Sequence, residues 1–234
     1  MTKEPVLLLI ETSTDTCSVA ISKGDRLIDE LVSSEPRAQA AKIGKMIQDI
    51  LINNGTTVND CDAVVVSEGP GSYTGLRVGV SAAKGLCYGA NKPLIAVSSL
   101  LLIAQLASKT NECALAVPHT IIPMIDARRM EVYCFRASSD LSTISETTAE
   151  VVDSESFSNE LSLGSVLFAG EGAMKIKDVI AHPNAHYSPV KALASGMILP
   201  ALAKYLKGEF VDTAYFEPFY LKDFVAGTSK KKFF

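Results

Sequence analysis

The stretch Glu68-Gly-Pro-Gly-Ser-Tyr-Thr-Gly-Leu-Arg77 decides how this chain folds. It follows a β-branched run, Asp62–Ser67, that predicts a strand buried on both faces, and it precedes a long segment of small residues that predicts a helix. The stretch is therefore expected to be a strand-to-helix turn. Its glycines and proline permit close backbone approach and positive φ, and Ser72 or Thr74 can cap the helix.

Two roles for this turn stay open from the residues alone. Free N–H groups at a helix N-terminus make a ready anion site, here with Gly71 and Ser72 as contacts. Glycine turns, however, mostly serve as tight structural corners, and that is the favoured interpretation. A Walker loop is excluded because no Gly-Lys-Ser/Thr follows, and the interval to Gly75 does not fit a dinucleotide fingerprint.

The amino-acid composition and net charge argue against several classes of function. The chain has 234 residues, of which 47% are hydrophobic and 21% are charged, and its net charge is −4. Because phosphate binding needs clustered cations, this balance argues against the chain holding nucleic acid by itself. Five scattered cysteines without a Cys-x-x-Cys pair fit buried thiols in a reducing compartment. No segment resembles a signal peptide or a membrane span, so a cytoplasmic location without membrane contact is expected.

The order of the expected elements divides the chain into two α/β domains. Three antiparallel strands open it, and then helix, strand, helix and strand alternate, which predicts right-handed crossovers and parallel pairing. A polar segment at Ser108–Cys113 marks the boundary, so the predicted domains are residues 1–108 and 109–234. The second half again begins with strands, and it includes a helix over Leu193–Leu206 that Gly208 ends.

The helix expected over Gly75–Ala90 carries little side-chain bulk. Each internal glycine costs about 1 kcal/mol of helix propensity, so close packing against another helix must offset the cost. That packing is either internal to the domain or part of a docking face for another subunit, formed together with the preceding helix. The residues predicted for the docking face are Ala40, Ile43, Ile47, Leu51, Gly75, Gly79, Ala82 and Leu86.

Catalytic patterns are scarce. His182 and His186 have the spacing of two zinc ligands, but the residues between them favour a turn, so no metal site is expected. No Gly-x-Ser-x-Gly elbow supports a serine hydrolase. Polar turns from both halves could flank the phosphates of a nucleotide, although turn-capping carboxylates are the favoured alternative. The candidate nucleotide or anion contacts are Glu11, Thr12, Ser13, Gly71, Ser72, Asp126, Arg128, Gly170 and Gly172.

Three arginines have an open role. Arg77, Arg128 and Arg129 could meet phosphate or acidic groups of a partner. Solvated salt bridges are an equally good interpretation of each.

Several segments together carry a family signature. They are Ile10–Ser13 with Cys17–Ala20, Glu68–Arg77, Ala83–Leu86, Ile125–Arg128 with Glu131–Tyr133, and Glu217–Leu221. In this order, over nearly the whole chain, they resemble the TsaB family, the small member of the glycoprotease-like TsaD/TsaB group in the actin/Hsp70/sugar-kinase superfamily. The resemblance implies an α/β fold of two ribonuclease-H-like domains with mixed sheets.

The resemblance also implies a function in making threonylcarbamoyladenosine on tRNA. TsaB-like proteins look like non-catalytic partners of TsaD, which transfers the threonylcarbamoyl group, and the ATPase TsaE joins the complex. The helices at about Arg37–Asn54 and Gly75–Ala90 are expected to pair with TsaD, or with a second copy when TsaD is absent. The chain is expected to contact tRNA only as part of the complex, and it is expected to bind no cofactor.

The chain departs from a catalytic member of the group at residues that would carry chemistry. Ser99 and Ile103 stand where TsaD carries two metal-binding histidines, and neither replaces an imidazole. Glu11 stands where the superfamily usually has aspartate, and Asp126–Arg128 lacks the glycines of a phosphate clasp. The prediction is an accessory subunit. The alternatives are a nucleotide-dependent enzyme or metalloglycoprotease of the same fold, and a stable homodimer with its own role.

Overall fold

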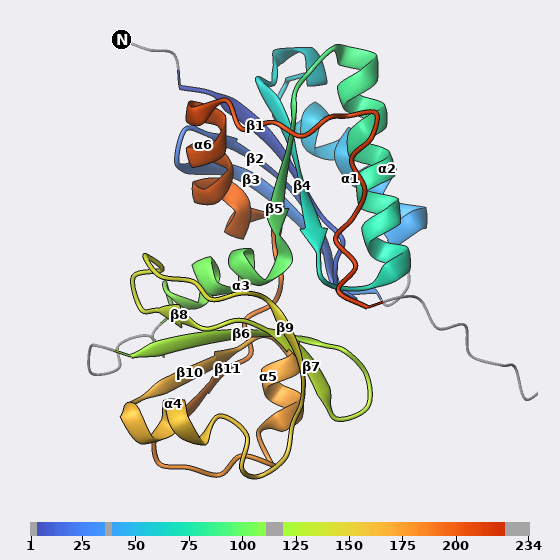
Figure 1. Cartoon of the computed structure of the whole chain (residues 1–234). Coiled ribbons are helices and arrows are strands. Elements are labelled where there is room, and N and C mark those ends of the chain that lie inside the picture. Colours follow the sequence, from blue (N-terminus) through green and yellow to red (C-terminus); the bar gives the residue numbers. More distant parts are fainter. Residues whose placement is uncertain (1–3, 36–38, 111–118, 223–234) are drawn as a thin grey trace, which may run out of the picture.

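The computed structural model describes residues 4–35, 39–110 and 119–222 (Figure 1). Arg37 and Cys113, which enter the predictions above, lie outside these residues. Within the described part of the chain, no helix combines the length and the hydrophobicity that crossing a membrane requires.

The first sheet has five strands in the order β3-β2-β1-β4-β5. The pairs β3–β2 and β2–β1 are antiparallel, whereas β1–β4 and β4–β5 are parallel, as the alternation of elements predicts. The elements of this half are β1 (Val6–Glu11), β2 (Cys17–Lys23), β3 (Arg26–Ser33), α1 (Gln39–Asn53), η1 (Val58–Asp60), β4 (Ala63–Gly69), α2 (Tyr73–Ala90), β5 (Leu94–Ser98) and α3 (Ser99–Ala107).

The second sheet repeats this topology. Its main path is β11-β10-β6-β7-β9, with β8 paired to β6, and read from β9 it again has two antiparallel and then two parallel pairings. The elements are β6 (Thr120–Asp126), β7 (Glu131–Cys134), β8 (Ala137–Ser138), β9 (Thr148–Val151), α4 (Ser158–Leu163), β10 (Val166–Ala169), α5 (Glu171–Ile176), β11 (Ala185–Ser188), η3 (Ala194–Met197) and α6 (Ile198–Lys207). The predicted α/β fold of two ribonuclease-H-like domains with mixed sheets is confirmed.

Three hydrophobic clusters hold the layers together. One fills the space between the first sheet and the pair α1 and α2, and a second lies between the other sheet and the pair α4 and α5. The third joins the inner faces of both sheets through α3, η3 and α6, so residues such as Leu9, Ile103 and Ile121 share one core. The lobes therefore pack on a common apolar layer, and Figure 1 shows α3 lying between them.

The chain returns to the first lobe after the second sheet. Helix α6 packs against β5, and beyond it Val211 forms a bridge with Leu94. Phe219 N then donates to Glu68 O at 2.7 Å, so the segment, red in Figure 1, runs beside α2. The predicted boundary at residue 108 between two folding units stays a prediction. Residues 198–222, which the sequence analysis assigned to the second domain, nevertheless return to the first lobe. Helical periodicity shows that α6 has an apolar face, not which sheet that face covers.

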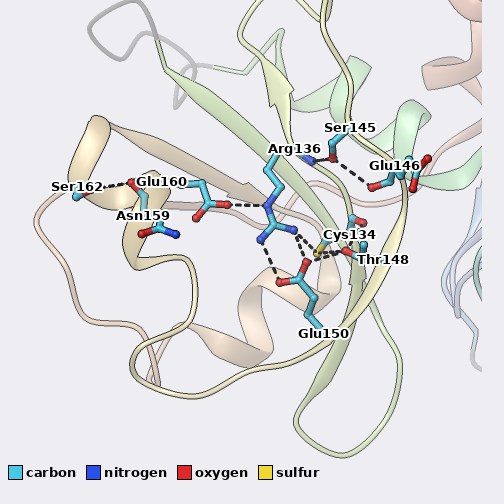
Figure 2. A network of polar contacts seen from close by, with 9 residues as sticks. All are labelled: Cys134, Arg136, Ser145, Glu146, Thr148, Glu150, Asn159, Glu160 and Ser162. Carbon is cyan, nitrogen blue, oxygen red and sulfur yellow. Dashed lines mark hydrogen bonds and ion pairs between the residues drawn. The ribbon is translucent and has the colours of Figure 1, made fainter.

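An ion network stabilises the second lobe (Figure 2). Arg136 forms ion pairs with Glu150 of β9 and, at 2.7 Å, with Glu160 of α4, and its Cζ lies 5.0 Å from the ring centroid of Phe157. Burial by itself would raise the pKa of Glu150, but hydrogen bonds from Arg136 bring it below its usual value. Because all three charged side chains keep only 22–28% exposure, removing one of them leaves its partners poorly solvated and costs more than breaking a solvated salt bridge.

Arg136→Met should lower the free energy of unfolding by about 2–3 kcal/mol at neutral pH, because it leaves two partly buried carboxylates unpaired. The contribution of Glu150, whose pKa is depressed, is present above the unfolded pKa near 4.5 and is lost as the pH falls through the folded pKa. Urea unfolding between about pH 7 and about pH 3 measures this difference. Lys45→Met, which breaks a surface pair with Asp49, is the control. An equal loss at every pH would contradict the electrostatic explanation.

Candidate functional site

The Gly-Pro-Gly stretch packs directly on the turn that follows β1. Ser72 N donates to Ser13 O at 2.7 Å, and Thr12 Oγ1 donates to Gly75 O at 2.8 Å. Ser72 Oγ accepts from Gly75 N, so the predicted cap of α2 is confirmed at Ser72. The N–H group of Ser72 that an anion would need is already used inside the chain, which supports the structural-corner interpretation.

The close approach explains why glycine stands at three positions. A Cβ atom would lie 2.3 Å from Ser13 O at Gly71, 2.1 Å from Thr12 O at Gly75, and 2.2 Å from Thr12 Oγ1 at Gly79. No side chain fits at such distances, because the neighbours are backbone or a short side chain. Gly75 and Gly79 are therefore packed inside their own lobe, and the prediction that they face a partner is wrong for these two residues.

Glu11 is fully buried at the end of β1. Its Oε1 accepts hydrogen bonds of 2.5 Å from both the N–H and the hydroxyl of Ser13. Ile10 pairs with Val66, so Ser67 follows on the neighbouring strand, and neither Glu11 Oε2 nor Ser67 Oγ has a hydrogen-bond partner of good geometry in the described part of the chain. Burial raises the pKa of Glu11, and the bonds from Ser13 only partly offset this.

Glu11→Gln should raise the free energy of unfolding by about 1–2 kcal/mol at neutral pH and change it little near pH 4. A raised folded pKa means that the folded chain holds its proton more tightly, so wild-type stability falls as the pH rises from 4.5 to the folded pKa. Glutamine keeps an acceptor for Ser13 and adds a donor toward Ser67. Urea unfolding at both pH values measures the difference. A variant less stable than wild type at neutral pH would contradict the argument.

The turn after β6 is built differently. Asp126 is exposed, accepts from Arg128 N at 2.7 Å and forms an ion pair with Lys175. The exposed Arg128 has a left-handed backbone with φ 68°. At Gly170 and Gly172 a Cβ would lie 2.4 Å and 2.9 Å from atoms of Met124 on β6. These glycines therefore also form a packed corner, without room for a phosphate on the side of their Cβ positions.

Charges of both signs lie where the two turns approach each other. Burial raises the pKa of Glu171, and so do the charges of Asp15 from the first turn and Asp126 from the second, with Lys191 acting in the opposite direction. The two lobes therefore bring their turns close to each other, with carboxylates and lysines both present. Nucleotide or anion contact at these turns stays a prediction. In the described ranges, no group of three or more His, Cys, Asp or Glu side chains is placed to hold a metal ion.

The predicted docking residues differ in how deeply they are buried. Ile43 and Ile47 are largely buried in the core under α1, with exposed fractions of 5% and 6%, which counts against extensive partner contact by either side chain. Ala40 is exposed. The half-buried members are Leu51, Ala82 and Leu86. Apolar spacing on α1 thus identified the side that faces the sheet, because burial in the core produces the same periodicity as burial against a partner.

The exposed side of these helices carries a different set of small residues. No atom lies within 4 Å of the Cβ position at Gly44, Gly85 or Gly89, and the neighbouring Tyr88 is 89% exposed. We call this surface the outer helical face; it comprises Ala40 and Gly44 on α1 with Arg77, Ser81, Gly85, Tyr88 and Gly89 on α2. Sequence reasoning missed most of it, although the i, i+4, i+8 spacing of Arg77, Ser81 and Gly85 was a usable signal.

A groove opens between the two helices on this face. It has a volume of ≈ 570 Å³, and its lining residues are Ala40, Ile43, Tyr73, Thr74, Arg77, Val78 and Ser81. Small and apolar side chains thus leave a concave surface at the N-terminal end of α2. Grooves of this kind between helices accept a helix or side chains of another polypeptide.

Comparison with known proteins agrees with this architecture. Residues 32–226 match the family described as TsaD, tRNA N6-adenosine threonylcarbamoyltransferase. The tRNA threonylcarbamoyladenosine biosynthesis protein TsaB of Escherichia coli K12 is 32% identical over 227 residues, which cover 94% of this chain and 96% of that protein. This chain belongs to the TsaB family. The TsaB of Haemophilus influenzae is 31% identical over 93% of both chains. YeaZ from Pseudomonas aeruginosa has a TM-score of 0.78, with 26% identity, over 93% of this chain and all of its own.

Membership in the TsaB family confirms the resemblance drawn from the sequence segments. In this TsaB-family chain, the positions compared with a metal-binding pair, Ser99 and Ile103, are both buried in α3. Ile103 contributes to the core between the lobes, where it contacts the Gly170 corner. Ile103 therefore serves packing.

Proposed function

We propose that this chain is an accessory subunit in the synthesis of threonylcarbamoyladenosine on tRNA, and that it binds a TsaD-like transferase through its outer helical face. The first support is family membership, since the relatives in Escherichia coli and Haemophilus influenzae carry that biosynthetic name. The second is a surface on α1 and α2 suited to a partner helix. The chain acts here as a scaffold and not as the transferase.

One observation carries the docking proposal. Gly44, Gly85 and Gly89 lie on exposed helix surfaces where an added Cβ would have no atom of the described residues within 4 Å. Each costs about 1 kcal/mol of helix stability relative to alanine, and no contact within the fold requires it. A partner helix that packs closely on these positions is a physical reason to keep them small, because helix axes approach to 8–10 Å only where side chains permit.

The interior supports a non-catalytic role. Glu11 is buried and its carboxylate is bonded to Ser13 of its own turn. A TsaE-like ATPase and tRNA are therefore proposed to act through the complex, since the chain has a net charge of −4. In isolation, the same face is proposed to pair with a second copy. The cytoplasmic location stays a prediction.

The solution mass of the chain, alone and after mixing with the TsaD-like transferase of the same source, tests this proposal. We expect a homodimer alone, a heterodimer after mixing, and threonylcarbamoyl transfer to tRNA that requires both chains. A homodimer that never exchanges would contradict the docking proposal. Brisk ATP hydrolysis by the isolated chain would contradict the scaffold role and favour an enzyme of the same fold.

A further inference from the structure

Arg77 is held in one orientation at the edge of the groove. Its Cζ lies 4.1 Å from the centroid of the Tyr73 ring, and its Nε donates to the hydroxyl of Tyr220 at 3.2 Å. The two tyrosine rings are themselves 5.0 Å apart. Stacking and the Nε hydrogen bond orient the guanidinium, and no hydrogen bond within the described residues engages its two terminal nitrogens.

The residue that orients Arg77 comes from a well-anchored segment. Lys84 Nζ donates to Ala214 O at 2.9 Å and to Phe216 O at 3.0 Å, and Phe219 N donates to Glu68 O. Directly after Tyr220 and Leu221, Lys222 forms an ion pair with Glu131 of the other lobe. Tyr220 is thus fixed from both sides, so it can hold Arg77 before any partner arrives.

Among the described residues Arg77 has no carboxylate within salt-bridge distance, although the hydrogen bond with Tyr220 and, less strongly, the charge of Glu217 raise its pKa. Helix α2 carries Arg77 and Lys84 but no Asp or Glu, and Lys84 is engaged with backbone carbonyls. The cations of α1 are paired, Lys42 with Glu35 and Lys45 with Asp49. Across residues 4–35, 39–110 and 119–222, no carboxylate forms an ion pair with Arg77, whose side chain is exposed.

We propose that Arg77, oriented by Tyr73 and Tyr220, is an anchor for a carboxylate on the helix of the partner protein that docks on the outer helical face. This inference rests on the proposed function and specifies the chemistry of that partner. A guanidinium with both terminal nitrogens free matches a carboxylate in a bidentate pair, and its fixed orientation reduces the entropy lost on binding. Two copies of this chain would each present Arg77 on a helix without acids, so the anchor favours a different chain over a second copy.

Arg77→Met should weaken binding of the TsaD-like partner by about 10–100-fold, as expected for a desolvated charge anchor, and should remove much of the salt dependence of Kd. Homodimer affinity should stay the same or increase. Titration calorimetry at low and high salt measures the first effect, and sedimentation equilibrium measures the second. Lys45→Met, which removes a paired cation of α1, should change either affinity by less than about twofold.

Tyr220→Phe tests the positioning residue, because it keeps the ring and removes the hydroxyl that Arg77 Nε contacts. We expect binding about 3–10-fold weaker, and no further loss when the change is added to Arg77→Met. Additive effects, or a matching loss of thermal stability, would overturn the positioning role.

The possible failures are distinguishable. Wild type that does not bind the TsaD-like partner at all would refute the proposed function. If the wild-type chain binds the partner and the Arg77→Met variant binds it with the same affinity, only the anchor role of Arg77 is refuted. Arg77→Lys keeps the charge without the bidentate fork, so it should recover part of the affinity and serves as the second variant.

Discussion

Gly75→Ala should destabilise the folded chain by more than about 3 kcal/mol, a loss in the range of severe backbone and packing defects. The new Cβ would lie 2.1 Å from Thr12 O, which is backbone and cannot rotate away. Relief requires moving α2 off the first turn, which also breaks the hydrogen bond from Thr12 Oγ1 to Gly75 O. Urea unfolding followed by circular dichroism measures the loss.

The same helix supplies the matched control. Gly85→Ala makes the identical chemical change at a position with nothing within 4 Å, so it should stabilise the chain by about 0.5–1 kcal/mol through helix propensity. Because alanine is the better helix former at both sites, any loss at Gly75 reports the contact with Thr12. Equal effects at the two positions would show that the corner is looser than the structure indicates.

Gly85→Leu should weaken association with the TsaD-like partner at least about 100-fold, because a bulky side chain separates two helices that need small residues to approach. The free energy of unfolding should stay unchanged or rise slightly, since leucine is a good helix former and its Cβ would have no atom of the described residues within 4 Å. Calorimetric titration with the partner and urea unfolding of the isolated variant measure the two quantities.

A control for surface hydrophobicity is Asn159→Leu, which changes an exposed residue of α4 on the other lobe. It should leave association unchanged. Gly79→Leu is not a clean probe of docking, because its side chain would collide with Thr12 and unfold the site. Unchanged partner binding by a folded Gly85→Leu chain would exclude the outer helical face as the docking surface.

Local sequence features predicted the elements because they act over a few residues. The run before Glu68 formed β4, Ser72 caps α2, and Gly208 ends α6 with φ 71°. The alternation of strands and helices also predicted the parallel pairings, since short connections leave few topologies. The segments of the family signature identified the family from residues alone, before any geometry was available.

The candidate site was predicted less well, for a specific reason. Small residues on α2 indicate that something approaches closely, but glycine has no side chain to show on which side. The contacts with Thr12 place Gly75 and Gly79 inward, whereas Gly85 and Gly89 face outward. Likewise, Ile43 and Ile47 have the spacing expected of either a core or an interface, and the structure places them in the core.

Residue order and local chemistry thus determined the secondary-structure elements, the α/β fold of two similar domains, and the family of this chain. Only the tertiary structure decided which glycines meet the first turn, that Glu11 is buried, and that Tyr220 reaches Arg77 from 143 residues away. The physical reason is that burial and contact depend on which distant segments pack together. The apolar layer between the lobes, with α6 returning to β5, sets those neighbours, and no short stretch of sequence contains them.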